Sequence, residues 1–169
     1  DKELVDPGAS YSLNEYLYVS GGEDSKILNH GMGIPPAELT EHKPTSVKIV
    51  ENVKSPIGHR IIVEAKSKNT PAIHSEYLLY NDIKRIDIIN KVKKEPTLKK
   101  EGIYFAFPFK TNNPAFAYQI QNGWLRPNKD QLPGAAREWF TTQNLVRVTD
   151  DDYTIAWASP DAPLFTLTD

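Results

Sequence analysis

Short runs of alternating apolar and polar residues extend through most of the chain, and proline, glycine or asparagine separates them. Four of these runs form two adjacent pairs, 47–53 with 59–65 and 72–80 with 84–92. Ser55-Pro56-Ile57-Gly58 separates the first pair, and Asn81-Asp82 separates the second. Alternation with a period of two, interrupted by turn residues, is typical of β-hairpins. The pattern therefore predicts two successive antiparallel hairpins.

The second half of the chain continues this pattern. Residues 102–109 are apolar at nearly every position, which predicts a central strand covered on both faces. Asn122-Gly123 is a strong two-residue hairpin signal between apolar runs on either side. The remaining predicted strands are 116–121, 124–126, 144–149, 153–158 and 163–168.

One segment near the N-terminus has helical spacing instead. Ser12 and Glu15 match a capping box, and Leu13, Tyr16 and Leu17 share one face at that spacing. A short helix is therefore predicted at this point.

The run 84–92 shows the alternation expected of a half-buried strand. Ile86, Ile88 and Val92 fall on one face, and mainly charged residues fall on the other. We expect the first face to be buried and the second to be solvated.

Hairpins in series without long amphipathic helices favour an antiparallel β-sandwich over a parallel α/β fold. The chain has no internal repeat and no low-complexity linker. A chain of 169 residues can bury about 70% of the surface that its unfolded form exposes. The expected structure is one all-β sandwich domain over residues 1–169, with at most two short helices.

The composition is that of a globular domain, with 39% hydrophobic and 25% charged residues. A net charge of −2 gives no overall attraction to nucleic acid or anionic lipid, and no apolar stretch approaches the length of a membrane span. The absence of cysteine excludes disulfides and thiolate zinc sites and leaves the cellular compartment open. The chain starts at Asp1, and its only methionine is Met32, which fits a segment of a longer protein.

Motifs for independent catalysis are missing from the sequence. The four histidines have no HxxxH or HExxH spacing for a metal, and GxSxG, P-loop and dinucleotide fingerprints are absent. The triplet 150–152 of aspartates has the charge to bind calcium, but its position between strands favours a solvated turn. The lysines of 91–100 could form an anion or polysaccharide site, but a solvated strand end and connector is the preferred interpretation.

The loop 130–140 combines aromatic and planar polar side chains, as carbohydrate sites do. Asp130, Gln131 and Arg137 could bind sugar hydroxyls while Trp139 stacks on the ring. In the alternative, Trp139 and Phe140 pack into the core, and Arg137 pairs with Asp130 or Glu138.

Four motifs in the same order resemble the C-terminal region of bacterial family 38 glycoside hydrolases, the α-mannosidase family. They are Leu13-Asn14-Glu15-Tyr16-Leu17-Tyr18, Ile103-Tyr104-Phe105-Ala106-Phe107-Pro108-Phe109, the loop Asp130-Gln131-Leu132-Pro133-Gly134 with Arg137-Glu138-Trp139-Phe140, and Thr154 to Pro160 with Asp161-Ala162-Pro163-Leu164. The resemblance implies a β-sandwich similar to the galactose mutarotase fold. It also implies that the zinc and the nucleophile belong to an N-terminal barrel, which this chain lacks, so neither is assigned to any residue here.

The sequence therefore predicts a non-catalytic sandwich module that supports a catalytic barrel and contributes the loop 130–140 to binding a mannoside-type glycan. A free-standing carbohydrate-binding module and a purely structural scaffold are the alternatives. The expected partners are the barrel, the glycan and a second copy of the chain, and no cofactor is expected in this segment.

Overall fold

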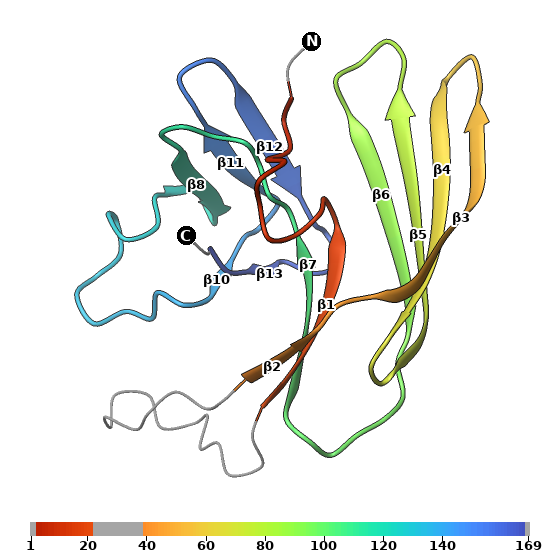
Figure 1. Ribbon diagram of the computed structural model, residues 1–169. Helices are drawn as coiled ribbons and strands as arrows, with labels where there is room; N and C mark the ends of the chain where they lie inside the picture. Colours follow the sequence, from red (N-terminus) through yellow and green to blue (C-terminus); the bar gives the residue numbers. More distant parts are fainter. Residues whose placement is uncertain (1–2, 22–38, 168–169) are drawn as a thin grey trace. The chain divides into compact units, whose positions relative to one another are not determined.

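The computed structural model describes residues 3–21 and 39–167, and these ranges contain strands and loops but no helix (Figure 1). The predicted all-β antiparallel class is confirmed. No helix long and apolar enough to cross a membrane is found in the same ranges. The chain divides into two compact units, Pro7–Pro108 and Asp1–Asp6 with Phe109–Asp169. The single domain expected over the whole chain remains a prediction.

The unit Pro7–Pro108 contains two antiparallel sheets. The three-stranded sheet has the order β2-β1-β7 and consists of β1 (Glu15–Gly21), β2 (Leu39–His42) and β7 (Glu101–Ala106). The four-stranded sheet has the order β3-β4-β5-β6 and consists of β3 (Thr45–Lys54), β4 (Gly58–Ser67), β5 (Thr70–Tyr80) and β6 (Ile86–Lys93).

The first two predicted hairpins are confirmed, since β3 pairs with β4 and β5 with β6. Ser55 fixes the first turn by accepting hydrogen bonds at Oγ from the backbone N–H groups of Ile57 and Gly58. A Cβ on Gly58 would lie 2.2 Å from the carbonyl oxygen of Leu79, so only glycine fits where β4 begins beside β5.

The helix predicted around residues 12–17 is wrong. The backbone N–H of Ser12 donates to Glu15 Oε2 at 2.7 Å, so part of the capping contact does form. Asn14, however, has a φ of 58°, which is incompatible with a right-handed helix. The chain leaves this turn as β1, because strand pairing with β7 takes the backbone hydrogen bonds that a helix would use.

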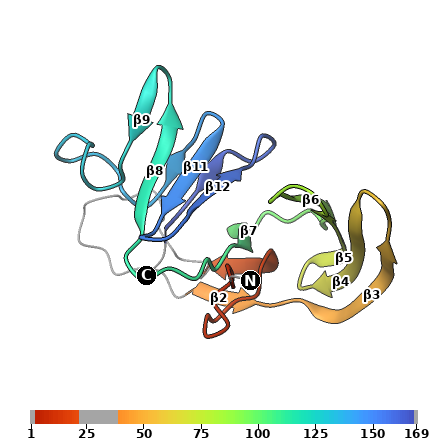
Figure 2. The ribbon, with the colours of Figure 1, turned by 90° about the horizontal axis from the view of Figure 1, so that it is seen from above.

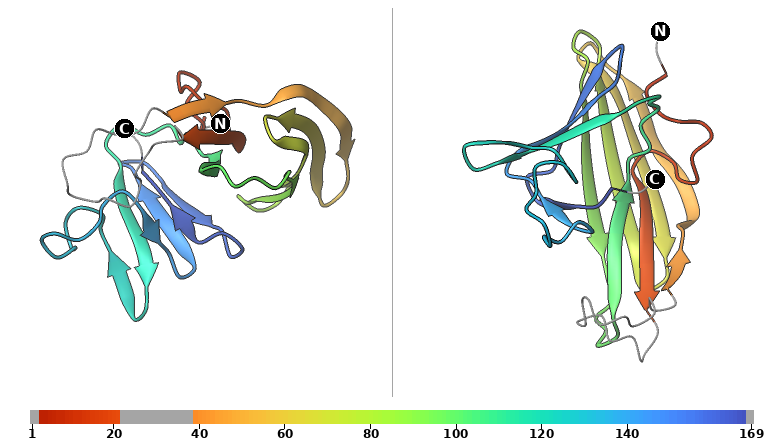
Figure 3. Two further views of the ribbon diagram at one scale, coloured as in Figure 1. Left: turned by 90° about the horizontal axis from the view of Figure 1, so that it is seen from below. Right: turned by 90° about the vertical axis from the view of Figure 1, so that its left-hand side faces the viewer.

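Side chains of β1 join the two sheets into a sandwich. Tyr16 and Tyr18 pack with Ile73 of the four-stranded sheet, and Phe105 meets Tyr16 edge to face with ring centroids 5.5 Å apart. The hydroxyls of Tyr16 and Thr70 share a buried hydrogen bond of 2.7 Å. Figure 2 shows β1 lying beside the curved sheet, and Figure 3 shows strands of the two sheets running alongside one another.

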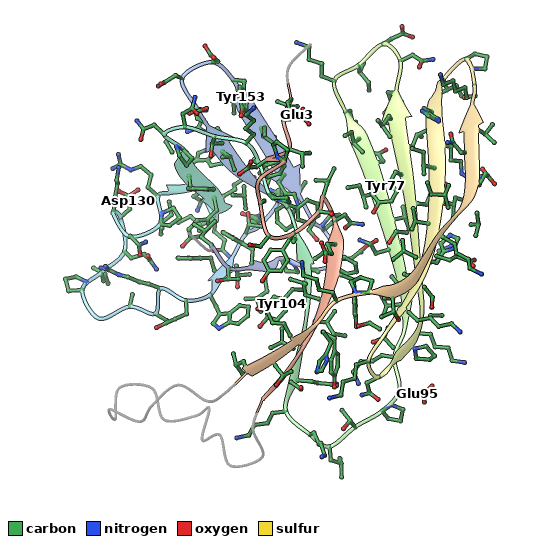
Figure 4. All side chains as sticks on the ribbon, viewed as in Figure 1. Glu3, Tyr77, Glu95, Tyr104, Asp130 and Tyr153 are labelled. Atoms are coloured by element: carbon green, nitrogen blue, oxygen red, sulfur yellow. The ribbon has the colours of Figure 1, made fainter. Side chains whose placement is uncertain are left out.

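A polar cluster fixes this packing near the start of β1. Asn14 and Asn90 exchange amide hydrogen bonds of 2.9 and 2.8 Å, and Asn14 Nδ2 also donates to the Tyr77 hydroxyl. Ser75 donates to Asn90 Oδ1 at 2.7 Å. Tyr77 lies on β5, within the layer that faces β1 (Figure 4). Asn14 is only 3% exposed, so the pairing offsets the cost of burying its amide.

A second polar cluster lies further along β1. Glu101 accepts hydrogen bonds from Tyr18 and Asn69 and forms an ion pair with Lys94. Burial acts to raise the pKa of Glu101, but hydrogen bonds from Lys94, Tyr18 and Asn69 outweigh it and hold the pKa below its usual value. The first residue of β7 is thereby tied to β1 and to the four-stranded sheet.

Two expectations about strand environments are wrong. β7 ends the β2-β1-β7 sheet among the described residues, so it is not a central strand. Apolar side chains on both faces report how a strand is covered and carry no information on how many strands pair with it. Ile86 and Val92 are 46% and 36% exposed, because β6 is an edge strand and β1 covers only part of the sheet face.

The unit that contains residues 109–167 has a four-stranded sheet of order β12-β11-β8-β9 and a separate pair, β10 with β13. The strands of the sheet are β8 (Ala115–Ile120), β9 (Gly123–Leu125), β11 (Leu145–Thr149) and β12 (Thr154–Ala158). The pair consists of β10 (Phe140–Thr141) and β13 (Leu164–Phe165). Both hairpins predicted here are confirmed, and Asn122 adopts a φ of 64° in the first turn.

An aromatic cluster holds the short strand pair against the sheet. Phe140 and Phe165 stack with centroids 5.4 Å apart, and each ring meets Tyr118 at 5.5 Å. Val146 and Trp157 complete this side of the core. Phe140 is 4% exposed, so the loop that precedes it is anchored at its C-terminal end.

Replacing Asn14 with alanine tests the polar cluster. The change removes both hydrogen bonds that the half-buried Asn90 exchanges with residue 14 and places alanine at positive φ, so we expect a loss of about 2–4 kcal/mol in the free energy of unfolding. Asn122→Ala removes the same side chain at a similar φ in an exposed turn and should cost about 1 kcal/mol. Equal losses in urea denaturation of the two variants would contradict a role for the cluster.

Candidate functional site

The loop between β9 and β10 contains every residue that the sequence singles out for sugar binding (Figure 4). It begins with a closed turn in which the backbone N–H groups of Lys129 and Asp130 donate to the carbonyl of Arg126. The Asp130 carboxylate accepts from Arg126 Nε at 2.9 Å, from Nη2 at 2.7 Å and from its backbone N–H at 2.8 Å. Asp130 is therefore engaged in shaping the loop.

Gln131 is also used within the loop. Its Oε1 accepts from the backbone N–H of Asn128 at 3.0 Å, and its Nε2 donates to the carbonyl of Ala136 at 2.9 Å. Gly134 has a φ of 81°, which a glycine adopts readily in a tight turn. These contacts give a loop without regular secondary structure a defined course.

The last residues of the loop differ in how far they are buried. Phe140 is in the core, as the alternative interpretation expects, whereas Trp139 is 43% exposed. Arg137 is exposed, and Arg126 occupies the carboxylate of Asp130 that Arg137 was expected to bind. Contact between sugar and any of these side chains remains a prediction.

Two cavities adjoin this loop along β8. The first, of about 260 Å³, has Arg126, Lys129 and Arg137 among its lining residues, together with Phe116 and Phe140. The second, of about 340 Å³, is lined by Arg126 and Arg147 with Thr149 and Thr154. Ala115, Phe116 and Arg126 belong to both, so the two cavities share a wall.

The charged side chains that line the cavities are all cationic, although the whole chain has a net charge of −2. The hydrogen bonds that Arg126 donates to Asp130 raise the pKa of the guanidinium, so it remains charged. Arg147 lies over the ring of Trp124, 5.0 Å from the centroid. Arg147 of β11 pairs with Ala117 of β8, and Val148 pairs with Phe116, so Arg147 lies on the face of the sheet opposite to Phe116.

Arg126, Lys129 and Arg147 were not singled out from the sequence. The spacing of four residues between Arg126 and Asp130 is a usable signal for an ion pair. Arg147 could not have been found in this way, because it belongs to a strand some twenty residues later whose neighbour is known only from the fold.

The other charged groups considered from the sequence have structural contacts. Asp150 accepts hydrogen bonds from the backbone N–H groups of Asn112 and Asn113, and Asp151 and Asp152 are exposed in the turn before β12. Lys94 is paired with Glu101 at the end of the lysine-rich run 91–100.

Zinc is the metal that the resemblance implies for the parent enzyme. Of the four histidines, His30 lies outside the described residues, and His42, His59 and His74 are in the described part of the chain. No group of three or more His, Cys, Asp or Glu side chains that could hold a metal occurs there. The described residues therefore do not fit a zinc site, and no catalytic step through zinc is assigned to them.

The fold and the braced loop define an antiparallel β-sandwich module. The sequence model of the glycosyl hydrolases family 38 C-terminal domain matches residues 34–159. The chain therefore belongs to this family of C-terminal domains, as the four sequence motifs suggested. Comparison with curated proteins gave no significant match, and comparison with solved structures gave none either.

The Arg126–Asp130 pair makes a testable electrostatic prediction. Hydrogen bonds from the Arg126 side chain and backbone lower the pKa of Asp130 from 3.8 to about 2. The pair therefore contributes its full stabilisation of the folded state above the ordinary pKa of aspartate, and this contribution is lost as the pH falls toward 2. Carboxyl NMR titration should give a midpoint near 2 in the native chain and a higher one, closer to 3.8, in Arg126→Gln. Equal midpoints would contradict the pairing.

Proposed function

We propose that this chain is a non-catalytic C-terminal module of an α-mannosidase-like glycoside hydrolase, which supports the catalytic barrel and contributes the loop 130–140 to carbohydrate binding. The observation that carries the proposal is the family match over residues 34–159. Belonging to the C-terminal domain family supports a module of a glycoside hydrolase, and the finer role is inferred from surfaces of the two units.

A surface suited to supporting another domain lies on the four-stranded sheet of the unit Pro7–Pro108. Ile49 pairs with Val63, and Ile86 pairs with Leu79, which puts these side chains on the face that β1 partly covers. Ile49 is 65% exposed and Leu79 is 37% exposed. Exposed apolar positions that share a sheet face are typical of surfaces that another protein layer covers.

The loop 130–140 supports the second part of the proposal. Asp130 and Gln131 shape its backbone, while the exposed Arg137 and the half-exposed Trp139 offer a planar donor and an aromatic face. Sugars are bound by this combination, because their hydroxyls accept hydrogen bonds and their C–H faces stack on rings. In this role Asp130 and Gln131 act through the shape of the loop.

The proposal predicts that the isolated chain does not hydrolyse aryl α-mannosides with or without added zinc, because the chemistry resides in another domain. Turnover that depends on zinc and copurifies with the chain would overturn the assignment. A glycan array on the same preparation tests the alternative, since strong mannoside binding without any partner would favour a free-standing carbohydrate-binding module.

Arg137→Ala in the full-length enzyme distinguishes a role in substrate binding from a role in stabilising the fold. If the loop contacts substrate, kcat/KM for a mannoside should fall by about tenfold or more while the thermal midpoint changes little, because Arg137 is exposed. Lys110→Ala removes an exposed cation of the same unit and serves as the matched control. A lowered thermal midpoint with unchanged kcat/KM would assign Arg137 a structural role instead.

The apolar sheet face predicts self-association of the isolated chain. Light scattering should show dimers or a mass that rises with concentration, and Ile49→Lys with Ile86→Lys should reduce this association. Val53→Lys is the control, because Val53 pairs with Arg60 on the opposite face and is also exposed. A monomer at high concentration would argue against an apolar contact surface.

A further inference from the structure

We propose that the two adjoining cavities along β8 form an oxyanion site, which binds the carboxylate or phosphate group of a sugar acid or sugar phosphate. Arg126 lines both cavities, Lys129 and Arg137 line the first, and Arg147 lines the second. It can be tested on the chain alone, and so it stands or falls separately from any catalytic partner.

Charge segregation is the first argument. Among the described residues, four different cations line the two cavities, and no Asp or Glu lines either one. The whole chain nevertheless has 22 acidic side chains and 20 Lys and Arg. A concave surface with one sign of charge concentrates ions of the opposite sign, even on a protein whose total charge is negative.

The arrangement of Arg126 is the second argument. Asp130 engages Nε and Nη2 of the guanidinium along one edge. A guanidinium has five N–H donors in a rigid plane, so the remaining edge can still bind an oxyanion in two-point fashion. Asp130 lines neither cavity, but its carboxylate lies 2.7 Å from Arg126 Nη2 and offsets part of that charge. Lys129, Arg137 and Arg147 therefore supply the remaining positive charge of the lining.

Fixed positions also distinguish this cluster from scattered surface charge. Arg147 extends from β11, and the Trp124 ring lies beneath its guanidinium. Phe116 is on β8, the strand to which β11 is paired. Two of the four cations are thus held by specific contacts, and a charged ligand loses less free energy when its partners are already oriented.

The lining also indicates what would carry the anion. Phe116 lines the first cavity, which the core residue Phe140 borders with only 4% exposure. Thr149 and Thr154 give the second cavity hydroxyls. Aromatic faces and hydroxyls suit a polyhydroxylated ring, whereas the arginines and Lys129 suit its acidic substituent. The cavities therefore favour a sugar derivative with an acidic group over one without it.

Calorimetric or NMR titration of the isolated chain tests the site with inorganic phosphate, a hexose 6-phosphate, a hexuronate and the neutral hexose. The hexose 6-phosphate or the hexuronate should bind more tightly than the neutral hexose by about tenfold, and added salt should weaken its binding. The stronger of these two ligands identifies the acidic group. Binding of the neutral hexose as tight as that of both acids would overturn the proposal.

Variants localise the binding. The double variant Lys129→Gln with Arg137→Gln should raise the Kd of the preferred ligand by about tenfold, since both cations line the first cavity. Arg147→Gln tests the second cavity separately and keeps the proposal falsifiable if the double variant unfolds. Lys110→Gln, outside both cavities, should change binding less than twofold. An equal effect of Lys110→Gln, or no effect of the cavity variants, would rule out a defined site.

Discussion

Two amide side chains, Asn14 and Asn90, exchange hydrogen bonds where β1 enters the sandwich of the unit Pro7–Pro108. Asn14 is 3% exposed, and an amide buried this deeply destabilises any packing in which it has no partner. Its pairing with the half-buried Asn90 therefore favours one position of β1 against the four-stranded sheet. The left-handed backbone of Asn14 sets the direction in which the chain leaves the preceding turn.

That position determines what the rest of β1 contacts. Tyr16 comes to lie beside Thr70 and Phe105, and Tyr18 reaches Glu101 at the start of β7. Each buried hydroxyl has a partner, and no described buried side-chain polar atom is left without a hydrogen bond. Polar contacts thus set the register of this sandwich, while aromatic and aliphatic contacts supply most of its cohesion.

The second unit uses different contacts to hold the loop 130–140. The stacked rings of Phe140 and Phe165 anchor one end, and the Arg126–Asp130 pair closes the other. A loop fixed at both ends can present Arg137 and Trp139 in a consistent geometry despite having no regular secondary structure. The same ion pair orients Arg126 beside the two cavities, so one contact serves both the loop and the proposed anion site.

The sequence was most informative where a local rule operates. Asn122-Gly123 and Ser55 act within a few residues, and every hairpin predicted from such turns is present. It failed where a distant partner overrides a local preference. The capping contact of Ser12 with Glu15 forms, yet pairing with β7 makes the following residues a strand.

The sequence pattern also could not predict which elements pack against a strand. Ile86 has the alternation of a buried position, but its exposure depends on how far β1 extends over the sheet. In the candidate site, Arg137 and Trp139 could be selected by residue type. The position of Arg147 in a cavity that Arg126 also lines could not, since it depends on the pairing of β11 with β8. Asp130 was chosen as a sugar ligand because its neighbour Arg126 was not considered as its partner.

The central claim is that this module supports a catalytic domain, and it can be measured directly by complementation. The catalytic barrel of the full-length enzyme would be produced without the module, and kcat/KM for a mannoside would be measured as the purified chain is added. A low value that rises to saturation with the added chain is the predicted result. A barrel that is fully active alone, and unchanged when the chain is added, would contradict the account.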